Sequence, residues 1–367
     1  MSSGMGMAVV ELDTPSLLVD LDRLESNIAH WAGVAQTSGV RLRPHFKTHK
    51  CIEIARMQQA AGAAGFTVAK VGEAEVMVGA GFTDIFVAYE VVGPSKLQRL
   101  ITLARTARIR VGVDSIAVAT ALSEAAVSGG ITLDVLIEVE TGLGRCGVLP
   151  GQPLLDLAKQ VEALPGLRVV GIFTYRGYRP NPEEAGLEEG TTMAREADYL
   201  RRAGIRVDEV SAGSTPTGRS VATVPGVTEI RPGTYVFYDA TQVVWGIATL
   251  EQCALTALAR VISRPARDVA ILDAGSKVLT TEFLCLDDKR KSYGIVRGLP
   301  KSYIDRLWEE HSRVRLSEEG YNLKVGDLVE IIPAHACPTV NLATDLVCVR
   351  GGYVVDQWEI AARGRVQ

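Results

Sequence analysis

DIFVAYEVVGPSKLQRLITLARTARIRVGV, residues 84–113, is the stretch that decides the fold. It contains a strand-like run, Asp84–Ala88, an amphipathic segment, Ser95–Thr106, and a second strand-like run, Ile109–Val113. β-Branched and aromatic residues favour strands, and the apolar spacing of the middle segment is typical of a helix. A strand, a helix and a strand in this order predict a βαβ unit whose two strands lie parallel in one sheet.

The same alternation extends in both directions, from about Thr14 to Tyr238. Further strand-like runs are Val40–Arg43, Gly65–Val68, Thr132–Val139, Arg168–Thr174, Arg206–Val210 and Thr228–Ile230. Further helical patterns are Leu21–Ser38, Cys51–Ala61, Gly72–Ala80, Ser115–Ser128, Pro153–Leu164 and Glu184–Ala203. Eight strands in regular βα alternation predict a closed parallel (β/α)8 barrel, with an open doubly wound sheet as the structural alternative.

After about Thr241 the pattern changes to short strand-like runs that are separated by turn residues. The runs are Ala254–Ile262, Val269–Leu272, Tyr293–Val296, Leu328–Ile332, Leu346–Arg350 and Tyr353–Glu359. They predict a second, mostly antiparallel β domain. We therefore expect a barrel over residues 13–240 and a β domain over residues 241–367. Residues 1–12 are assigned to the β domain because Val9–Leu12 has the pattern of an added strand.

Composition excludes several classes of partner. The formal net charge is −4 at pH 7, which argues against nucleic acid or an anionic membrane as the main partner. No run approaches the ~18 apolar residues that a membrane-spanning helix needs. Residues 1–11 lack the basic and apolar segments of a secretion signal. The six cysteines are scattered without a C-x-x-C pair, which favours reduced thiols in the cytoplasm.

A cluster of basic residues, RLRPHFKTHK at 41–50, ends the first barrel strand. If the strand continues through it, Arg41, Arg43, His45 and Lys47 face the same side. Several cations around Lys47 favour its neutral amine, which is the form that makes a Schiff base. Barrels place catalysis at the carboxyl ends of their strands. The residues alone leave a solvated basic turn as the alternative.

The segment Arg43–Lys50 resembles the cofactor-lysine segment of the D-threonine aldolase and D-serine dehydratase family, which is related to the alanine racemases. The resemblance runs from Asp13-Thr14-Pro15 to a C-terminal His-x-Cys, with several motifs in the expected order. It implies a barrel followed by a β domain, a pyridoxal 5′-phosphate cofactor on Lys47, and a homodimer.

Two further barrel-end residues receive roles from this resemblance. Arg145, in the Gly-rich turn ETGLGRCG at 140–147, is expected to contact the phenolic oxygen of the cofactor. Tyr175, which follows the sixth strand, is expected to lie against the pyridine ring. Taken alone, an arginine in a Gly-rich turn or a tyrosine at a strand end is more typical of ordinary packing.

Small hydroxyl residues follow the seventh and eighth strands, in SAGSTPTG at 211–218 and RPGT at 231–234. Barrels commonly bind phosphate at these two loops. We therefore assign the cofactor phosphate to Ser214, Thr215, Gly233 and Thr234. By resemblance to the racemases, Arg231 faces the pyridine nitrogen, where a fixed cation makes the ring a poorer electron sink. Gln242 is a further candidate for contact with cofactor or substrate.

The reaction type is indicated by PAHACPTVN at 333–341. On an extended strand His335 and Cys337 point the same way and can bind one metal, although a buried cysteine beside a satisfied histidine is the alternative from the residues alone. The resemblance favours the metal, because dehydratases of this family carry His-x-Cys and bind zinc, whereas aldolases carry His-x-Asp and prefer harder ions. Zn2+ is therefore expected, with Mn2+ or Mg2+ as alternatives.

These expectations predict a lyase acting on D-β-hydroxy amino acids such as D-serine, D-threonine or 3-hydroxy-D-aspartate. The first hypothesis is a dehydratase that yields an oxo acid and ammonia. The alternatives are an aldolase that yields glycine and an aldehyde, and a non-catalytic carrier of pyridoxal phosphate. Racemisation is not expected, because Asp273–Lys277, the counterpart of the racemases' catalytic-tyrosine segment, contains no tyrosine.

Overall fold

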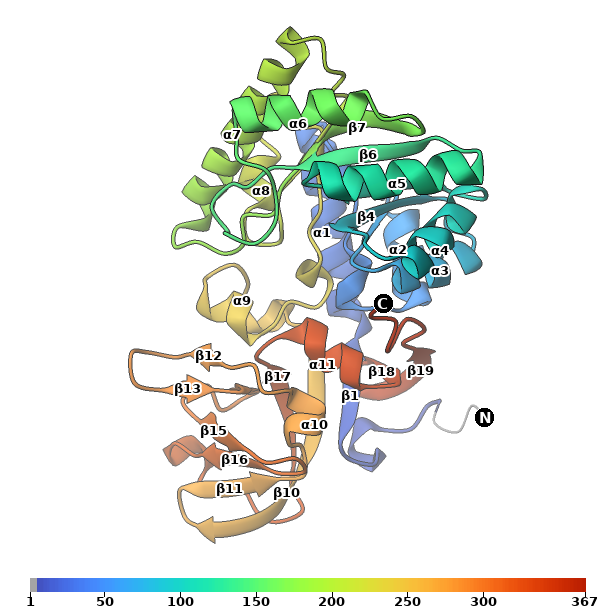
Figure 1. Ribbon diagram of the computed structural model, residues 1–367. Helices are drawn as coiled ribbons and strands as arrows, with labels where there is room; N and C mark the ends of the chain where they lie inside the picture. Colours follow the sequence, from blue (N-terminus) through green and yellow to red (C-terminus); the bar gives the residue numbers. More distant parts are fainter. Residues whose placement is uncertain (1–4) are drawn as a thin grey trace. The chain divides into compact units, whose positions relative to one another are not determined.

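The computed structural model describes residues 5–367, which form two compact units (Figure 1). The barrel unit comprises Ala29–Lys47, Ile54–Gly233 and Gly364–Gln367, and the described part of the β unit comprises residues 5–28, Thr48–Glu53 and Thr234–Arg363. These bounds differ from the expected boundary after residue 240, since the β unit takes in residues from the beginning and the middle of the chain. Residues 1–4, which we assigned to the β domain, lie outside the described residues.

The barrel unit is built on eight parallel strands in the order β2-β9-β8-β7-β6-β5-β4-β3. Their bounds are β2 Arg41–Leu42, β3 Phe66–Val68, β4 Asp84–Glu90, β5 Arg108–Val113, β6 Leu133–Glu138, β7 Leu167–Phe173, β8 Glu209–Ala212 and β9 Glu229–Ile230. A parallel bridge between His45 and Thr67 joins the two ends of this order and closes the barrel. The predicted (β/α)8 barrel is thereby confirmed, and the open sheet is excluded.

Helices connect the barrel strands on the outside. Their bounds are α1 Leu21–Ser38, α2 Ile52–Ala60, α3 Val71–Gly79, α4 Pro94–Ala104, α5 Ile116–Gly129, α6 Gln152–Glu162, α7 Pro182–Arg202 and α8 Gly218–Val221. Figure 1 shows α5 and α6 flanking β6 and β7. Each helix turns its apolar side inward, as α4 does with Leu97, Leu100 and Ile101, which are buried. The predicted helices agree with these to within a few residues.

The barrel interior is layered, because alternate residues of a strand face the same side. On β6 these are Asp134, Leu136 and Glu138, from the amino end to the carboxyl end. Leu136 packs in a buried cluster with Phe86 and Phe173, whose rings meet edge to face at 5.0 Å. An apolar layer therefore separates a charged amino end from a polar carboxyl end.

The charged side chains at the amino end form what we call the amino-end network, which consists of Arg43, Asp84, Arg110, Glu209 and Glu229. Arg43 Nε lies 2.7 Å from Glu229 Oε2, and Arg110 Nε lies 2.9 Å from Glu209 Oε1. Both guanidinium groups also contact Asp84. Burial alone would raise the pKa of Glu229, but Arg43 beside it holds that pKa below its ordinary value. Buried charges at this end are thus paired with opposite charges.

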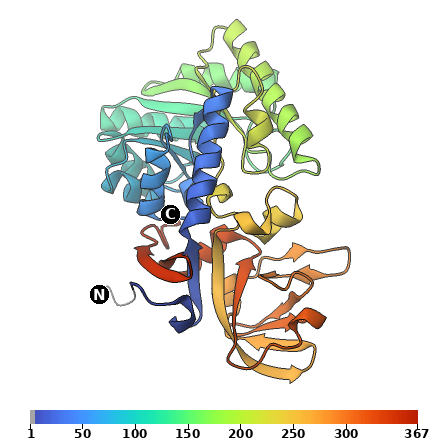
Figure 2. The same cartoon turned by 180° about the vertical axis from the view of Figure 1, so that it is seen from behind.

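The β unit contains a nine-stranded sheet and a small hairpin. The strands are β1 Ser16–Asp20, β10 Leu255–Ala266, β11 Val269–Leu272, β12 Leu284–Cys285, β13 Lys291–Ser292, β14 Gly294–Val296, β15 Tyr303–Leu307, β16 Ser312–Arg315, β17 Leu328–Pro333, β18 Asp345–Arg350 and β19 Tyr353–Glu359. Short helices are α9 Ala240–Val244, α10 Ser276–Leu279 and α11 Ala336–Leu342. All strand pairs except β1 with β18 are antiparallel, as predicted. Figure 2 shows β10 lying between β1 and β17.

One expected strand of the β unit is wrong. Val9–Glu11 forms a single 3-10 turn, in which the carboxylate of Glu11 accepts a hydrogen bond from the backbone N–H of Ala8 at 3.0 Å. The strand that the N-terminal part of the chain does supply is β1, which pairs with β10 on one side and β18 on the other. Within residues 5–367, no helix is long and apolar enough to span a membrane.

Candidate functional site

Lys47 lies in a 3-10 turn, Phe46–Thr48, and not on the strand that was expected to carry it. Strand β2 ends at Leu42, two residues before Pro44, whose ring fixes its own φ and restricts the residue before it. Arg43 consequently belongs to the amino-end network, and Lys47 belongs to the opposite end of the barrel. The expectation that Arg41 and Arg43 surround Lys47 is wrong, because both arginines are paired with Glu229.

Three predicted cofactor residues lie together at the carboxyl end of the barrel. Lys47 Nζ is 5.8 Å from the ring centroid of Tyr175, and the guanidinium carbon of Arg145 is 5.2 Å from the same centroid. Tyr175 is 38% exposed, so its ring is open to a ligand. The loops after β2, β6 and β7 position these side chains. The arrangement places one amine and one permanent cation around an accessible aromatic face, which suits a planar anionic cofactor.

Arg231 is buried below this group. Its Nη1 donates to Ser211 Oγ at 2.6 Å, its Nη2 donates to the carbonyl of Thr174, and its guanidinium carbon lies 5.4 Å from the ring centroid of Phe173. Burial lowers the pKa of Arg231 from its ordinary value. The hydrogen bonds fix the guanidinium plane, so Arg231 is a rigid cation at the top of the apolar layer.

The loop after β8 carries the predicted phosphate residues Ser214 and Thr215. A fully buried acid that the sequence did not reveal, Glu189 of α7, shapes this loop. Its Oε1 accepts from the backbone N–H of Gly213 and its Oε2 accepts from Thr217 Oγ1, both at 2.9 Å. Gly213 has φ +81°, and a Cβ there would lie 2.9 Å from the Cα of Gly218, so only glycine fits.

The loop after β9 contains Arg231 and Gly233, and the two loops are tied together because the N–H of Arg231 donates to the carbonyl of Gly213 at 3.1 Å. Thr234 follows directly in the chain and begins a 3-10 turn that belongs to the β unit. Gln242 lies in α9 of the same unit. Its Oε1 is buried and has no hydrogen-bond partner within residues 5–367, as expected of a side chain that contacts a ligand.

His335 and Cys337 do not lie on one extended strand, so the geometry that we predicted for them is wrong. Strand β17 ends at Pro333, His335 is the extended residue before α11, and Cys337 lies in the first turn of that helix. Pro338 is compatible with this turn because the first helical N–H groups have no partner within the helix. The two side chains nevertheless lie close enough to interact, because Cys337 is among the groups that raise the pKa of His335.

The surroundings of His335 are acidic. Its Nδ1 lies 2.6 Å from Glu282 Oε2. Burial opposes the charged form of the imidazole, but Cys337, Asp239 and Glu282 outweigh it and raise the pKa of His335 to about 10. The thiol of Cys337 contacts the hydroxyl of Thr48, the residue directly after Lys47, at 3.3 Å. An imidazole and a thiol beside acidic groups form a donor set that suits Zn2+ once both have lost their protons to the metal.

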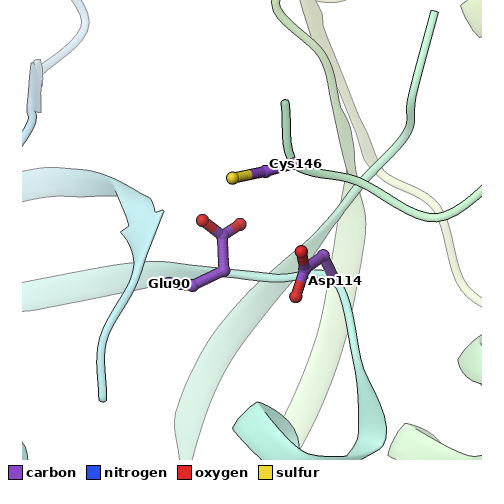
Figure 3. Close-up of side chains that lie close together, drawn as sticks. All are labelled: Glu90, Asp114 and Cys146. Carbon is purple, nitrogen blue, oxygen red and sulfur yellow. The ribbon is translucent and has the colours of Figure 1, made fainter. Parts of the chain in front are cut away.

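A second group of possible metal ligands lies in the barrel unit (Figure 3). Glu90, Asp114 and Cys146 place one ligand atom each within 4.8 Å of the others. Burial, followed by a hydrogen bond to Glu90, raises the pKa of the neighbouring Glu138 to about 9, and Arg145 Nη2 lies 3.8 Å from Glu138 Oε1. We call these five residues the carboxyl-end cluster. The sequence did not predict them as a group, since they follow three different strands.

Comparison with known proteins identifies the family. The model of the alanine racemase N-terminal domain matches residues 19–241, and that of the serine dehydratase domain matches residues 254–349. D-threonine aldolase from Arthrobacter sp is 39% identical over 98% of this chain and 95% of that protein. D-threo-3-hydroxyaspartate dehydratase from Delftia sp. strain HT23 is 34% identical over 90% and 92%. The chain therefore belongs to the alanine-racemase-like family that includes these two lyases, as the resemblance implied.

Solved structures agree with this membership. D-threonine aldolase from Filomicrobium marinum has a TM-score of 0.90 and 34% identity, with both chains covered completely. Structures of D-threo-3-hydroxyaspartate dehydratase include a histidine-to-alanine mutant and a cysteine-to-alanine mutant in the metal-free form, both 32% identical to this chain, and the two mutated residues are two positions apart.

Proposed function

We propose that the protein is a pyridoxal-phosphate- and zinc-dependent lyase that removes the β-hydroxyl of a D-amino acid and yields an oxo acid and ammonia. The observation that carries the proposal is the convergence of Lys47 and Arg145 on the open ring face of Tyr175. The unpartnered amide oxygen of Gln242 and the hydroxyl-lined loop at Ser214 and Thr215 fit a ligand of this class.

The residues of the barrel unit have distinct tasks. When bound, pyridoxal phosphate withdraws electrons from the α-carbon of the amino acid that it holds. Lys47 would hold the cofactor, and its free amine would take the proton from that α-carbon. Tyr175 would support the ring, and Arg145 would bind its phenolic oxygen. Arg231 would face the ring nitrogen, and two hydrogen bonds fix its guanidinium group.

The phosphate and the metal are assigned to further side chains. Ser214, Thr215, Gly233 and Thr234 would hold the phosphate through hydroxyl and backbone N–H groups. His335 and Cys337 would hold zinc, with Mn2+ or Mg2+ as the harder alternatives. If bound there, the metal would supply a Lewis acid that assists departure of the β-hydroxyl as water. Hydrolysis of the resulting enamine would consume one water and release ammonia. The water lost in the elimination equals the water consumed, so D-serine would be converted to an oxo acid and ammonia with no net gain or loss of water.

Dehydratase is favoured over aldolase by Cys337, a soft ligand at the position where the resemblance assigns an aspartate to aldolases. The spacing of the mutated histidine and cysteine in D-threo-3-hydroxyaspartate dehydratase matches that of His335 and Cys337. Aldolase remains the second candidate, because the Arthrobacter aldolase is 39% identical to this chain. We also infer a homodimer from the racemase-like architecture, and a cytoplasmic location from six cysteines that form no disulfide.

The reaction is tested by incubating the holoenzyme with D-serine, D-threonine and the 3-hydroxy-D-aspartates, and with their L-forms. We expect oxo acid and ammonia in equal amounts from the D-substrates and no product from the L-forms. Glycine with an aldehyde as the main products would replace the dehydratase proposal by the aldolase. The variant Cys337→Asp should shift metal preference from zinc toward manganese and lower elimination. An unchanged preference and product ratio would show that residue 337 does not determine the chemistry.

A further inference from the structure

Two residues at the start of helix α9, Asp239 and Thr241, are hydrogen-bonded to the backbone on the two sides of His335. Asp239 is the residue before the helix, and it is 1% exposed. Its Oδ1 accepts from the backbone N–H of Gln242 at 3.0 Å, which caps α9, and its Oδ2 accepts from the backbone N–H of Ala336 at 3.1 Å. One buried carboxylate therefore joins the start of α9 to the first residue of α11.

Thr241, two residues further on, anchors the other side of His335. Both its backbone N–H and its hydroxyl donate to the carbonyl of Ala334, at 3.2 Å and 2.6 Å. Ala334 and Ala336 are the two neighbours of His335 in the chain. The backbone on each side of His335 is thus fixed by hydrogen bonds to the same turn of α9.

This anchoring acts on both predicted metal ligands. The first N–H groups of a helix have no acceptor within the helix, and that of Ala336 is one of these in α11. Asp239 supplies the acceptor for it. The next residue is Cys337, whose direction follows from where α11 begins. His335 has extended angles, φ −140° and ψ 120°, which α11 itself does not impose. Without the contacts at Ala334 and Ala336, the turn between β17 and α11 loses what orients the imidazole toward the thiol.

We propose that Asp239 and Thr241 form a clamp that holds His335 and Cys337 in the arrangement needed to bind metal, so that both are positioning residues of the metal site. The inference rests on the proposed function, because that function assigns the metal to His335 and Cys337. The carboxylate of Asp239 accepts from the backbone N–H groups of Gln242 and Ala336, so it acts on the two ligands through the backbone.

The clamp is tested by measuring zinc affinity of the holoenzyme by competition with a chromophoric chelator. In Asp239→Asn one side-chain oxygen becomes an NH2 group, which cannot accept from the second backbone N–H. Removal of an outer partner of a metal ligand typically costs about 10–100-fold in affinity. We expect that loss for Asp239→Asn and a smaller one for Thr241→Val, with Thr241→Ser restoring the affinity because it keeps the hydroxyl.

Asp287→Asn is the matched control. Asp287 also accepts from two backbone N–H groups, those of Lys289 and Arg290, but it lies in an exposed turn. The control should keep the zinc affinity of the natural protein. Circular dichroism and the cofactor absorbance of each variant show whether the fold and the cofactor site are retained, so that a lost metal site is distinguished from unfolding.

The outcomes separate the two levels of the proposal. If the natural protein binds no zinc, the proposed metal site is wrong. If it binds zinc and Asp239→Asn and Thr241→Val bind it equally well, the clamp is overturned and the proposed function stands. If Asp239→Asn fails to fold, the pair Thr241→Val and Thr241→Ser decides, because equal affinity in these two variants overturns the clamp and a difference between them supports it.

Discussion

Both ends of the barrel are lined with charged side chains, and they differ in how those charges are balanced. In the amino-end network each buried acid lies within ion-pair distance of a guanidinium group. In the carboxyl-end cluster Glu138 lies against a second acid, Glu90, and the guanidinium group of Arg145 approaches only to 3.8 Å. The pKa of Glu229 in the network is therefore lowered, whereas that of Glu138 is raised to about 9.

The difference separates two uses of buried charge in one barrel. Paired charges hold the strands in place, and losing one partner leaves the other uncompensated in a site closed to water. Unbalanced groups at a barrel mouth are typical of sites that bind or transfer charge, because their ionisation responds to a ligand. We therefore expect substitutions at the carboxyl end to change activity more than stability, and substitutions at the amino end to do the reverse.

The largest effect is expected at Lys47. Lys47→Met removes the amine that holds the cofactor and takes the α-proton, so turnover should fall by at least ~100-fold. The cofactor-free forms of variant and natural protein should unfold at the same urea concentration. Borohydride reduction followed by peptide mapping should find the pyridoxyl group on Lys47 in the natural protein.

Lys70 provides the control for this substitution. It also follows a barrel strand, β3, and its Nζ lies 3.6 Å from the ring centroid of a tyrosine, Tyr89. Lys70→Met should retain the cofactor absorbance and most of the activity. Labelling of Lys70 instead of Lys47 would contradict the assignment and would place the cofactor over a different strand.

The next effect is expected in the amino-end network. Glu229→Gln removes one of the two carboxylates that pair with the buried guanidinium group of Arg43 and leaves only Asp84, and breaking a buried pair typically costs about 3–5 kcal/mol. Urea unfolding monitored by circular dichroism at pH 7 measures the loss. The folded fraction should keep the specific activity of the natural protein.

An exposed ion pair of the same unit is the comparison for Glu229. Asp208 lies beside Arg206 at the surface, where both side chains are more than half exposed. Asp208→Asn should cost less than about 1 kcal/mol. Equal losses for Asp208→Asn and Glu229→Gln would show that pairing in the amino-end network does not stabilise the barrel.

Much of this molecule could be predicted from local sequence. Helix α1 begins and ends where its periodicity predicts, and Lys47, Arg145 and Tyr175 lie together because barrel topology brings the carboxyl ends of strands to one side. The identity of the family followed from motif order and is confirmed by the comparisons.

The errors share a physical cause, which is that they depend on contacts between distant residues. β1 is a strand because it pairs with β10 and β18, more than two hundred residues further along. Strand β8 begins at Glu209, three residues after the predicted start, because its register is set by its pairing with β7. β15 and β16 were missed because charged residues such as Asp305 and Arg313, which pair across the strands, interrupt their apolar pattern.

One further error could have been avoided from the local sequence. The strand predicted through His335 and Cys337 overlooked Pro338, a residue that is common in the first turn of a helix. By contrast, the clamp formed by Asp239 and Thr241 had no local signal, since the partners lie about ninety residues further along the chain.

The most narrowly defined effect concerns the pH dependence of stability, and it is specific to the carboxyl-end cluster. The pKa of Glu138 is raised to about 9 in the folded protein, because the side chain is buried and hydrogen-bonded to Glu90. In the unfolded chain its pKa is the ordinary value of a glutamate, 4.5. Between these two pH values the folded state binds more protons than the unfolded state, so the contribution of Glu138 to stability decreases as the pH rises.

Glu138→Gln removes this titration, and the free energy of unfolding of the variant should therefore decrease less than that of the natural protein between pH 5 and pH 9. The measurement is a series of urea unfolding curves of the cofactor-free proteins across that range. Glu162→Gln, a substitution in helix α6 of the same unit, should leave the slope unchanged. Parallel pH profiles for Glu138→Gln and the natural protein would mean that Glu138 is ionised in the folded barrel, and the contrast between its two ends would then rest on ion-pair geometry alone.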